Sequence, residues 1–311
     1  MSRNLALRGA LLAGVIGLLA ACGGGPDGAG GASPGAAVAD TGAIIGAVTK
    51  DPGLNAALPQ SITQSGTLRL ASNIQSAPNN FYAADGKTPV GYEVDIAKAI
   101  GAKLGVGVGY QDMAFGSLIT SLQSGRIDLT MAAMNDTKAR QEQIDFVDYF
   151  TSGITIMIRK GNPDGIGGPD ALCGKKVAVV QGTSHQKFAE EQSAKCAQAG
   201  RPALEVTATD SDNQNQNQLR TGRVQAILND LPSAVYIART AGDGKYFEVV
   251  PGEPINGGPY GIGVRKQDRP LAEAVRNALN ALISDGTYGK ILQAWGVQRG
   301  AVKEAVINGG S

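Results

Sequence analysis

Short apolar segments with the period of a strand alternate along this chain with longer segments that have the period of a helix. Thr67–Ala71 alternates as a strand, and Tyr92–Leu104 places its apolar side chains on one helical face. A second helix is predicted from about Gly116 to Gln123, and a glycine turn leads from it into a strand at Ile127–Ala132. Strands and helices at this spacing predict an α/β fold with a mostly parallel sheet.

The pattern of helix, glycine and strand occurs at Leu122–Ile127 and again at Leu219–Val224. Such turns look alike in many α/β proteins, but the repeat also fits two lobes of similar design. Ile154–Ile158 and Tyr260–Val264 are the candidate crossovers between the lobes, which would make the second lobe an insertion in the first. The predicted boundaries are 61–153 for the first part of lobe 1, 154–256 for lobe 2, 257–299 for the second part of lobe 1, and 300–311 for a C-terminal tail.

The first residues of the chain predict export. Arg3 and Arg8 flank an apolar run from Ala10 to Ala21 that is too short to cross a bilayer as a permanent helix. The run ends in Leu-Ala-Ala followed by Cys22, which resembles the bacterial lipobox and implies a signal peptide at 1–21 and lipid on Cys22. An ordinary secretory signal or a buried helix is the alternative, and neither explains a cysteine at the cleavage point.

Residues 23–41 consist almost only of Gly, Ala, Ser, Pro and Asp, which bury too little apolar surface to offset the entropy of ordering. We therefore expect a lipidated N-terminus and flexible tether over 22–60, although the part from 42 to 60 could pack loosely on the folded body. This arrangement predicts a protein anchored by lipid to the extracytoplasmic face of the cell membrane.

Charge and composition exclude several function classes. The net charge is +1 and aromatic residues make up 5% of the chain, with no basic run, so nucleic acid is not an expected partner. The one histidine, His185, is expected on a helix surface, which argues against a zinc site and a Ser-His-Asp triad. We expect no metal and no cofactor, and Trp295 is expected to anchor the last helix in the core.

Apart from Cys22, the cysteines are Cys173 and Cys196, and an isolated pair in an exported protein suggests a disulfide. Lys176–Val180 is predicted to be a strand and Ser184–Ala197 the helix that returns beside it, so the two cysteines should be neighbours. Two unrelated buried thiols are the alternative.

The segment Gly91–Ile96 resembles a signature of the family 3 bacterial extracellular solute-binding proteins, the polar amino-acid receptors of ABC importers. The resemblance covers about residues 64–298. It implies a two-lobe type II periplasmic-binding-protein fold with two hinge crossovers, a ligand cleft between the lobes, and a monomer that delivers its ligand to ABC transporter permease subunits. The other matching segments are Phe115–Leu118, Gly125–Asp128, Arg140 with Ile144–Phe146, Val177–Thr183, Asn229–Asp230 and Asp285–Tyr288.

The resemblance also implies how the two charged ends of an amino acid are bound. Arg140 is similar to the family's carboxylate-binding arginine, and a planar guanidinium suits a bidentate carboxylate pair, although its charged neighbours alone favour a surface arginine. Asp230 matches the ammonium-binding aspartate, although an aspartate before Leu-Pro is otherwise a common turn or cap. Gln181 and Asn229 belong to the same matched segments and are candidate ligand contacts.

Thr183 and Phe115 are further candidates. Thr183 stands where a strand gives way to a helix, so its hydroxyl and the free amides could bind an anion, cap the helix, or do both. Phe115 resembles the aromatic residue that packs on the ligand side chain, and an ordinary core position is the alternative.

Departures from the family pattern bear on the ligand's charge. Asn73 stands where many relatives have aspartate, Ser76 where some have an aromatic residue, and Ala133 and Asn135 where Gly or Ser and Thr are usual. Without an acid at position 73, a cationic side chain loses a natural counter-charge. We therefore expect a neutral polar or acidic amino acid in preference to arginine, lysine or histidine.

Three rival functions are considered. Some proteins similar to the family are dehydratases, but the matched positions contain no surplus carboxylate to act as a general acid, so we expect no enzyme. A sensor module would need a separate membrane partner, because this sequence ends in a short tail. The third rival is a binding protein for another organic acid or an opine.

Overall fold

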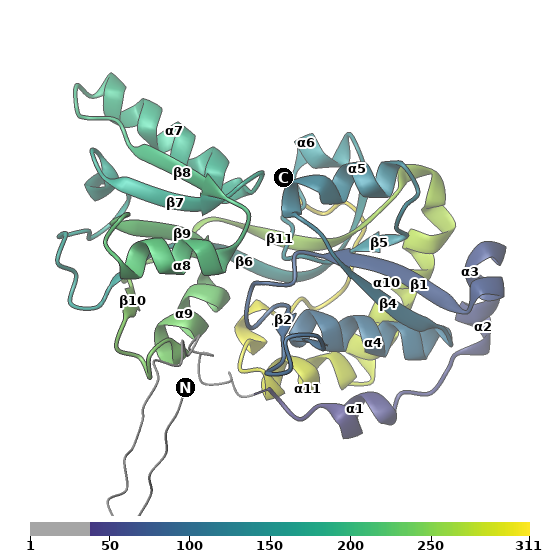
Figure 1. Ribbon diagram of the computed structural model, residues 1–311. Helices are drawn as coiled ribbons and strands as arrows, with labels where there is room; N and C mark the ends of the chain where they lie inside the picture. Colours follow the sequence, from purple (N-terminus) through teal and green to yellow (C-terminus); the bar gives the residue numbers. More distant parts are fainter. Residues whose placement is uncertain (1–37) are drawn as a thin grey trace, which may run out of the picture. The chain divides into compact units, whose positions relative to one another are not determined.

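The computed structural model describes residues 38–311, so the predicted signal peptide and the lipidation of Cys22 lie outside the described residues. The described chain forms a mixed sheet of nine strands in the order β4-β1-β5-β11-β6-β9-β7-β8, with β10 also paired to β6 (Figure 1). The strands are β1 Thr67–Ser72, β4 Gly107–Asp112, β5 Leu129–Thr130, β6 Asp145–Arg159, β7 Lys176–Val180, β8 Glu205–Thr209, β9 Ala226–Asp230, β10 Phe247–Val249 and β11 Ile255–Val264, and a separate hairpin joins β2 Phe81–Tyr82 to β3 Pro89–Val90.

Helices cover both faces of this sheet (Figure 1). Within residues 38–311, no helix has both the length and the apolar character needed to cross a bilayer. The helices are α1 Gly42–Gly46, α2 Pro52–Ala56, α3 Gln60–Ser65, α4 Tyr92–Leu104, α5 Leu118–Gln123, α6 Lys138–Gln141, α7 Ser184–Gln198, α8 Asp212–Arg220, α9 Leu231–Thr240, α10 Arg269–Ser284 and α11 Thr287–Ala294.

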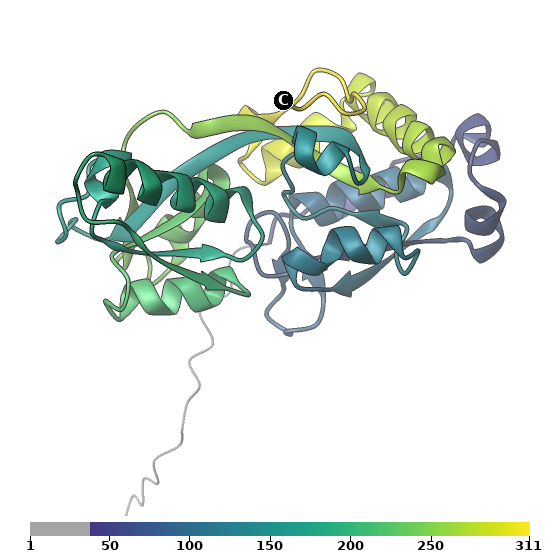
Figure 2. The same cartoon turned by 90° about the horizontal axis from the view of Figure 1, so that it is seen from above.

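Strands β6 and β11 connect two lobes and run side by side between them (Figure 2). Beside them, the first lobe contains β1, β4 and β5, and the second contains β7, β8, β9 and β10. Ile154–Ile158 already pairs with β9 in the second lobe, and Gly263 and Val264 pair with β5 in the first. Strand β6 therefore crosses from the first lobe to the second before Ile154, and β11 crosses back before Gly263. The boundaries of 153/154 and 256/257 remain a prediction.

The sheet is less parallel than expected. The pairs of β1 with β4 and β5, and of β7 with β8 and β9, are parallel. Every antiparallel pair in the large sheet contains β6 or β11, because these two strands carry the chain out of the first lobe and back again.

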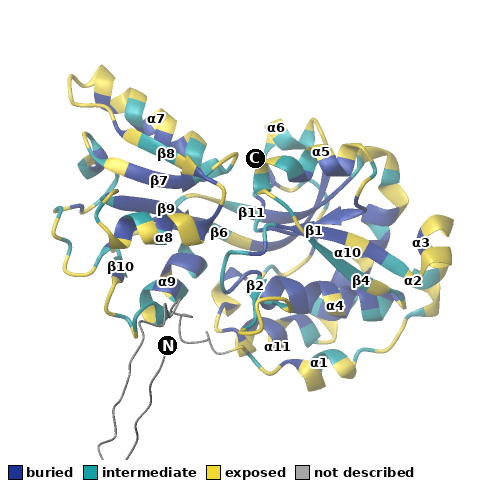
Figure 3. Ribbon diagram, viewed as in Figure 1, coloured by how far each residue is buried: buried dark blue, intermediate teal, exposed yellow. Residues whose placement is uncertain are grey.

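Each lobe has its own apolar core, which Figure 3 shows as buried residues on the strands and on the inward faces of the helices. In α4 the apolar positions expected from the sequence are all buried, and Gly105, with φ of +72°, ends the helix in the left-handed conformation that glycine favours. Trp295 is also buried in the core of the first lobe and donates from Nε1 to Asp95 at 2.8 Å.

Two elements near the cleft differ from the expected bounds. The helix expected from Gly116 begins with a short 3-10 turn at Phe115–Ser117, and α5 starts at Leu118. The strand expected at Ile127–Ala132 is reduced to the two residues of β5, and Ala133 just beyond it has φ of +47°. The strand pairing thus ends at Thr130, and the left-handed turn at Ala133 prevents the strand from resuming beyond the apolar run.

Residues 38–60 are packed on the first lobe, so the expectation of a flexible tether is wrong for this part. Thr41 donates to Asp95 at 2.7 Å, and the side chain of Asn55 donates to the carbonyl of Leu104 at 2.8 Å. The side chain of Leu58 is buried in the core of the first lobe. The sequence reasoning gave too little weight to the apolar residues after position 43.

The C-terminal segment 300–311 also packs on the first lobe. Its residues Ala301 and Ile307 form isolated bridges with β6, and the amide of Gly310 donates to Asp136 at 2.8 Å. In the second lobe Cys173 and Cys196 form the predicted disulfide, with their Cα atoms 5.6 Å apart.

Candidate functional site

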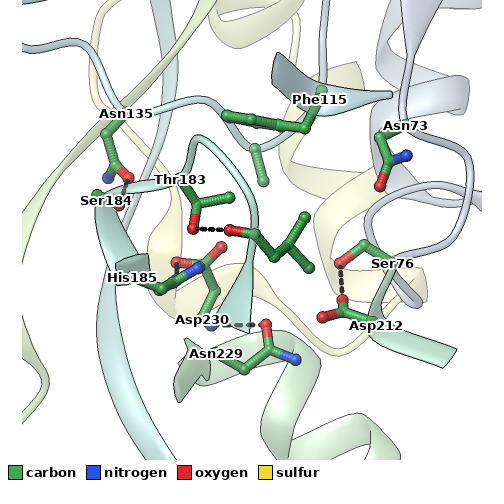
Figure 4. A pocket seen from close by; sticks show the side chains of 13 residues that line it. Asn73, Ser76, Phe115, Asn135, Thr183, Ser184, His185, Asp212, Asn229 and Asp230 are labelled. Atoms are coloured by element: carbon green, nitrogen blue, oxygen red, sulfur yellow. Dashed lines mark hydrogen bonds and ion pairs between the residues drawn. The ribbon is translucent and has the colours of Figure 1, made fainter. Parts of the chain in front are cut away.

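A small cavity lies between the two lobes, at the carboxyl ends of parallel strands from both (Figure 4). Ligands of open α/β sheets bind at such positions. Its volume of about 40 Å³ has room for little more than a water molecule or two. The lining residues are Asn73, Ser76, Phe115, Ala132, Ala133 and Asn135 from the first lobe, and Val180, Thr183, Ser184, His185, Asp212, Asn229 and Asp230 from the second.

Most of the side chains predicted to bind ligand therefore meet at one place. Asn73 donates from Nδ2 to the carbonyl of Met113 at 3.2 Å, which fixes its amide beside the cavity. Thr183 caps α7 by accepting from the amide of Gln186, and its own hydroxyl donates to the carbonyl of Val180 at 2.6 Å. Thr183 therefore caps the helix, as the alternative stated, and it also lines the cavity.

Arg140 adjoins the cavity but does not line it. Its guanidinium donates to the carbonyl of Asn135 at 2.9 Å and to the carbonyl of Gly182 in the other lobe at 3.2 Å. Its Cζ lies 5.5 Å from the centre of the Phe115 ring, over the aromatic face. Burial lowers the pKa of Arg140 to about 10, although the charges of Asp230 and Asp136 act in the opposite direction. The side chain therefore remains cationic near neutral pH.

Gln181 is placed differently from the prediction. It is exposed and does not line the cavity, although its backbone amide donates to the carbonyl of Thr209 at 2.8 Å. Side chains alternate in direction at the end of β7, so Val180 faces the cavity and its neighbour faces away.

Hydrogen bonds join the lobes on two sides of the cavity. On one side Ser184 donates to Oδ1 of Asn135 at 2.6 Å, and on the other Ser76 donates to Oδ2 of Asp212 at 2.8 Å (Figure 4). With the Arg140 contact, these bonds hold the lobes together around the cavity. The two lobes are therefore closed around the cavity in this structure.

His185 is buried in this cavity, so the expectation that it lies on a helix surface is wrong. Its imidazole Nε2 lies 3.1 Å from Oδ1 of Asp230, and only 7% of the residue is exposed. Burial opposes the charged imidazole, but the charge and hydrogen bond of Asp230 and the charge of Asp212 outweigh it and raise the pKa of His185 above 6.5. Residues 38–311 contain no group of three His, Cys, Asp or Glu side chains able to hold a metal.

Asp212 is a second acid of the cavity. It stands at the start of α8, after β8, and only 6% of it is exposed. Burial raises its pKa, while the hydrogen bond from Ser76 and the charge of His185 act in the opposite direction. In the same helix Asn215 is fully buried and accepts from the hydroxyl of Thr209 at 2.7 Å.

Glu93 supports the cavity from behind. It is buried and accepts from the amide of Ala133 at 2.7 Å, from the hydroxyl of Tyr149 and from the amide group of Asn80. Burial raises the pKa of Glu93 to about 7, against these three hydrogen bonds. The carboxyl group thereby fixes Ala133, a cavity residue with a left-handed backbone.

Comparison with known proteins assigns the family. Residues 68–298 match the bacterial extracellular solute-binding proteins, family 3. The chain belongs to this family. The arginine-binding protein ArgT of Corynebacterium glutamicum is 27% identical over 258 residues, which cover 83% of each chain. The L-cystine-binding protein TcyJ of Escherichia coli is 29% identical over 239 residues, 76% of this chain and 85% of that one.

The solved structures agree with this family and with the type II periplasmic-binding-protein fold. The ancestral amino acid-binding protein AncCDT-1, described as a precursor of cyclohexadienyl dehydratase, matches with a TM-score of 0.68 at 31% identity over 76% of this chain and 97% of that chain. The curated relatives of this solute-binding protein are amino-acid-binding proteins of ABC transporters.

In this solute-binding protein, sequence reasoning overlooked His185, Asp212 and Ser184. A signal for His185 was present, because it shares the buried face of α7 with Phe188, Ala189, Gln192 and Cys196, at helical spacing. Asp212 begins the helix that follows β8, which places it at the ligand-binding edge of a parallel sheet. His185 was attributed to an exposed helix surface, and Asp212 was not considered.

Proposed function

We propose that this protein captures a polar amino acid between its lobes and delivers it to the permease subunits of an ABC transporter. The observation that carries the proposal is the placement of Arg140 in the first lobe and Asp230 in the second, on either side of one cavity. A guanidinium binds a carboxylate and a carboxylate binds an ammonium, so the two ends of an amino acid meet opposite charges on different lobes. A ligand bonded to both lobes stabilises their closed arrangement.

The other cavity residues have supporting roles in this proposal. The ligand carboxylate replaces the carbonyl of Gly182 as an acceptor for Arg140 and takes a bond from the start of α7 at Thr183. Phe115 packs on the ligand, since its ring already lies beside the guanidinium. The remaining proposed contacts are Asn73, Ser76, Ala133, Asn135 and Asn229.

The charges around the cavity favour a neutral side chain on the ligand. The two charged ends of the ligand take up Arg140 and Asp230, and Asn73 lines the cavity with a neutral amide. Asp212, the other acid of the cavity, already accepts a hydrogen bond from Ser76 at 2.8 Å. A cationic side chain would therefore be buried without a free counter-charge. We therefore propose a neutral or acidic amino acid in preference to a cationic one, with neutral first.

A lipid anchor is the second part of the proposal. The support is the apolar run ending at Cys22 and its Gly-rich continuation. Expression of the full chain with a labelled fatty acid should incorporate label into the parent protein, and Cys22→Ala should abolish the incorporation. Label retained in that variant would contradict anchoring at this cysteine.

Amino-acid binding can be tested on the body from residue 38 onward. We expect one or a few neutral or acidic amino acids to raise the melting temperature by several degrees at concentrations far above Kd. Calorimetry should then show that Arg140→Ala and Asp230→Ala each weaken binding by about a hundredfold or more. The controls are Arg299→Ala and Asp170→Ala, which remove exposed side chains. Parental affinity in both cleft variants would refute the site.

The likeness to a dehydratase precursor makes an enzyme the alternative to be tested. Saturated protein should be incubated with the bound amino acid and with cyclic organic acids, and the solution followed by NMR. An unchanged ligand supports a binding protein. Conversion of the amino acid or of a cyclic organic acid, with loss of that conversion in Asp230→Ala, would favour an enzyme. Binding confined to organic acids or opines would change the ligand class.

A further inference from the structure

A second and larger cavity adjoins the first. Its volume is about 480 Å³, which is in the usual range for a small-molecule pocket. It lies between the segment that follows β1 in the first lobe and α8 and α9 in the second. The lining residues are Ile74, Gln75, Ala77, Phe81, Tyr82, Ala83, Ala84, Gly86, Asn213, Gln216, Tyr236, Ile237, Thr240, Ala241 and Gly242. We call this the outer cavity and the one at Asp230 the inner cavity.

The two cavities meet at Ser76 and Asp212. Ser76 and Asp212 line the inner cavity, whereas Ala77 and Asn213, the next residue of each segment, line the outer one. The bond of 2.8 Å between Ser76 and Asp212 thus stands at the boundary. Ser76 Oγ also lies 3.4 Å from Oγ of Ser233 on α9, so the small side chain of Ser76 makes both of these contacts between the lobes. A ligand that enters as the lobes open can take their place.

The outer cavity is lined without a single charged side chain. Gln75, Asn213 and Gln216 offer amide groups, and Phe81 of the first lobe faces Tyr236 of the second with ring centres 6.2 Å apart. The hydroxyl of Tyr236 is buried and has no hydrogen-bond partner within residues 38–311. Such a lining accepts aromatic and amide groups, and it offers a cation no carboxylate of its own.

We propose that the outer cavity binds the far end of the ligand, and that the ligand is an amino acid with a long neutral tail that ends in a planar aromatic or amide group. Its charged head occupies the inner cavity, and its tail passes between Ser76 and Asp212. The inner cavity has room for little more than a water molecule or two in this closed arrangement, so it leaves no space for a side chain beside a bound head, and the tail continues outward. This inference rests on the proposed amino-acid binding and names the side chain that the site takes.

The test compares three probes with the same head group by calorimetry: L-glutamine, its N5-phenyl amide, and L-arginine. The phenyl amide should bind about tenfold or more tightly than L-glutamine, because its ring is buried in the outer cavity. L-arginine, of similar reach but cationic, should bind more weakly than the phenyl amide. Equal affinity of the phenyl amide and L-glutamine overturns the inference while amino-acid binding stands.

A filling variant locates the gain. Ala84→Trp places a large ring in the outer cavity from an exposed position, so the phenyl amide should lose its advantage and the ratio of the two affinities should approach one. Val235→Trp is the matched control, because Val235 is exposed on α9 but does not line the cavity. An advantage that survives Ala84→Trp would place the ring elsewhere. Failure of every amino acid and of all three probes to bind would instead refute the proposed function itself.

Discussion

The imidazole of His185 lies 3.1 Å from the carboxylate of Asp230, the group proposed to receive the ligand's ammonium. Both side chains are buried and belong to the second lobe, His185 on α7 and Asp230 at the end of β9. An ammonium that binds Asp230 must therefore share it with an imidazole already in place. The competition is strongest when the imidazole is protonated.

This competition predicts that affinity increases as the pH rises above 6.5. The raised pKa keeps His185 protonated at and somewhat above this pH, and its loss of a proton leaves Asp230 free for the ammonium. Asp212 and Arg140 also face the imidazole, the first favouring its charge and the second opposing it. Calorimetry in buffers of different ionisation enthalpy should detect release of a proton on binding.

The matched variant is His185→Gln, which retains a hydrogen-bonding group at Asp230 but does not titrate. Its affinity should be nearly independent of pH above 6.5, and no proton should be released. A parental protein whose affinity falls with rising pH in this window would contradict the competition.

Glu93→Gln should make stability less dependent on pH. The folded-state pKa of Glu93, about 7, lies above its ordinary value of 4.5, so its contribution is fully present below pH 4.5 and is lost as the pH rises through 7. Between pH 5 and pH 8 the parent should lose about 2 to 3 kcal/mol of unfolding free energy that the variant retains. The amide can still accept from Ala133 and Tyr149.

The measurement is urea denaturation of both proteins at several pH values. Other buried groups with raised pKa, such as Asp148 and His185, have the same sign, so only the difference between the two proteins reports on Glu93. Parallel stability curves for parent and variant would show that Glu93 is charged throughout this range.

Local patterns in the sequence were sufficient for much of the fold. The apolar spacing of Tyr92–Leu104 predicted α4 to the residue, because helical period is a local property. Lys176–Val180 was predicted as a strand with the bounds that β7 has in the structure. The two cysteines could be paired because a short strand and a returning helix fix their separation.

The candidate site was only partly accessible from sequence. Ser76 and Asp212 are 136 positions apart, and no local pattern predicts that the lobes bring them into contact. The family resemblance placed Asp230 but gave no information on His185 beside it. Ala133 has a left-handed backbone and donates its amide to the buried carboxyl of Glu93, a contact over 40 positions that no local pattern predicts.

Asn308 should be a stabilising contact of the C-terminal segment. Its side chain accepts from the amide of Phe146 at 2.8 Å and donates to Asp145 at 2.9 Å, and its φ is +59°. Asn308→Gly should lower the unfolding free energy by about 2 kcal/mol through loss of both bonds. Asn308→Ala should cost about 1 kcal/mol more, because alanine disfavours the left-handed conformation.

The control for this segment is Glu304→Ala, which removes an exposed side chain and should change the unfolding free energy by less than about 0.5 kcal/mol. Equal stability of all three variants and the parent in urea denaturation would show that the side chain of Asn308 contributes nothing to stability.

The disulfide should support stability without affecting the site. Cys173 and Cys196 are 23 positions apart, and closing a loop of that length is worth about 3 kcal/mol in the chain-entropy model. Neither residue lines the cavity. Replacing both by alanine should therefore lower the melting temperature by about 10 °C while the affinity for the amino acid stays within about twofold of the parent. A large loss of affinity in a double variant that still folds would mean that the start of α7 depends on the disulfide for its position. This part of the helix contributes Thr183 and His185 to the cavity.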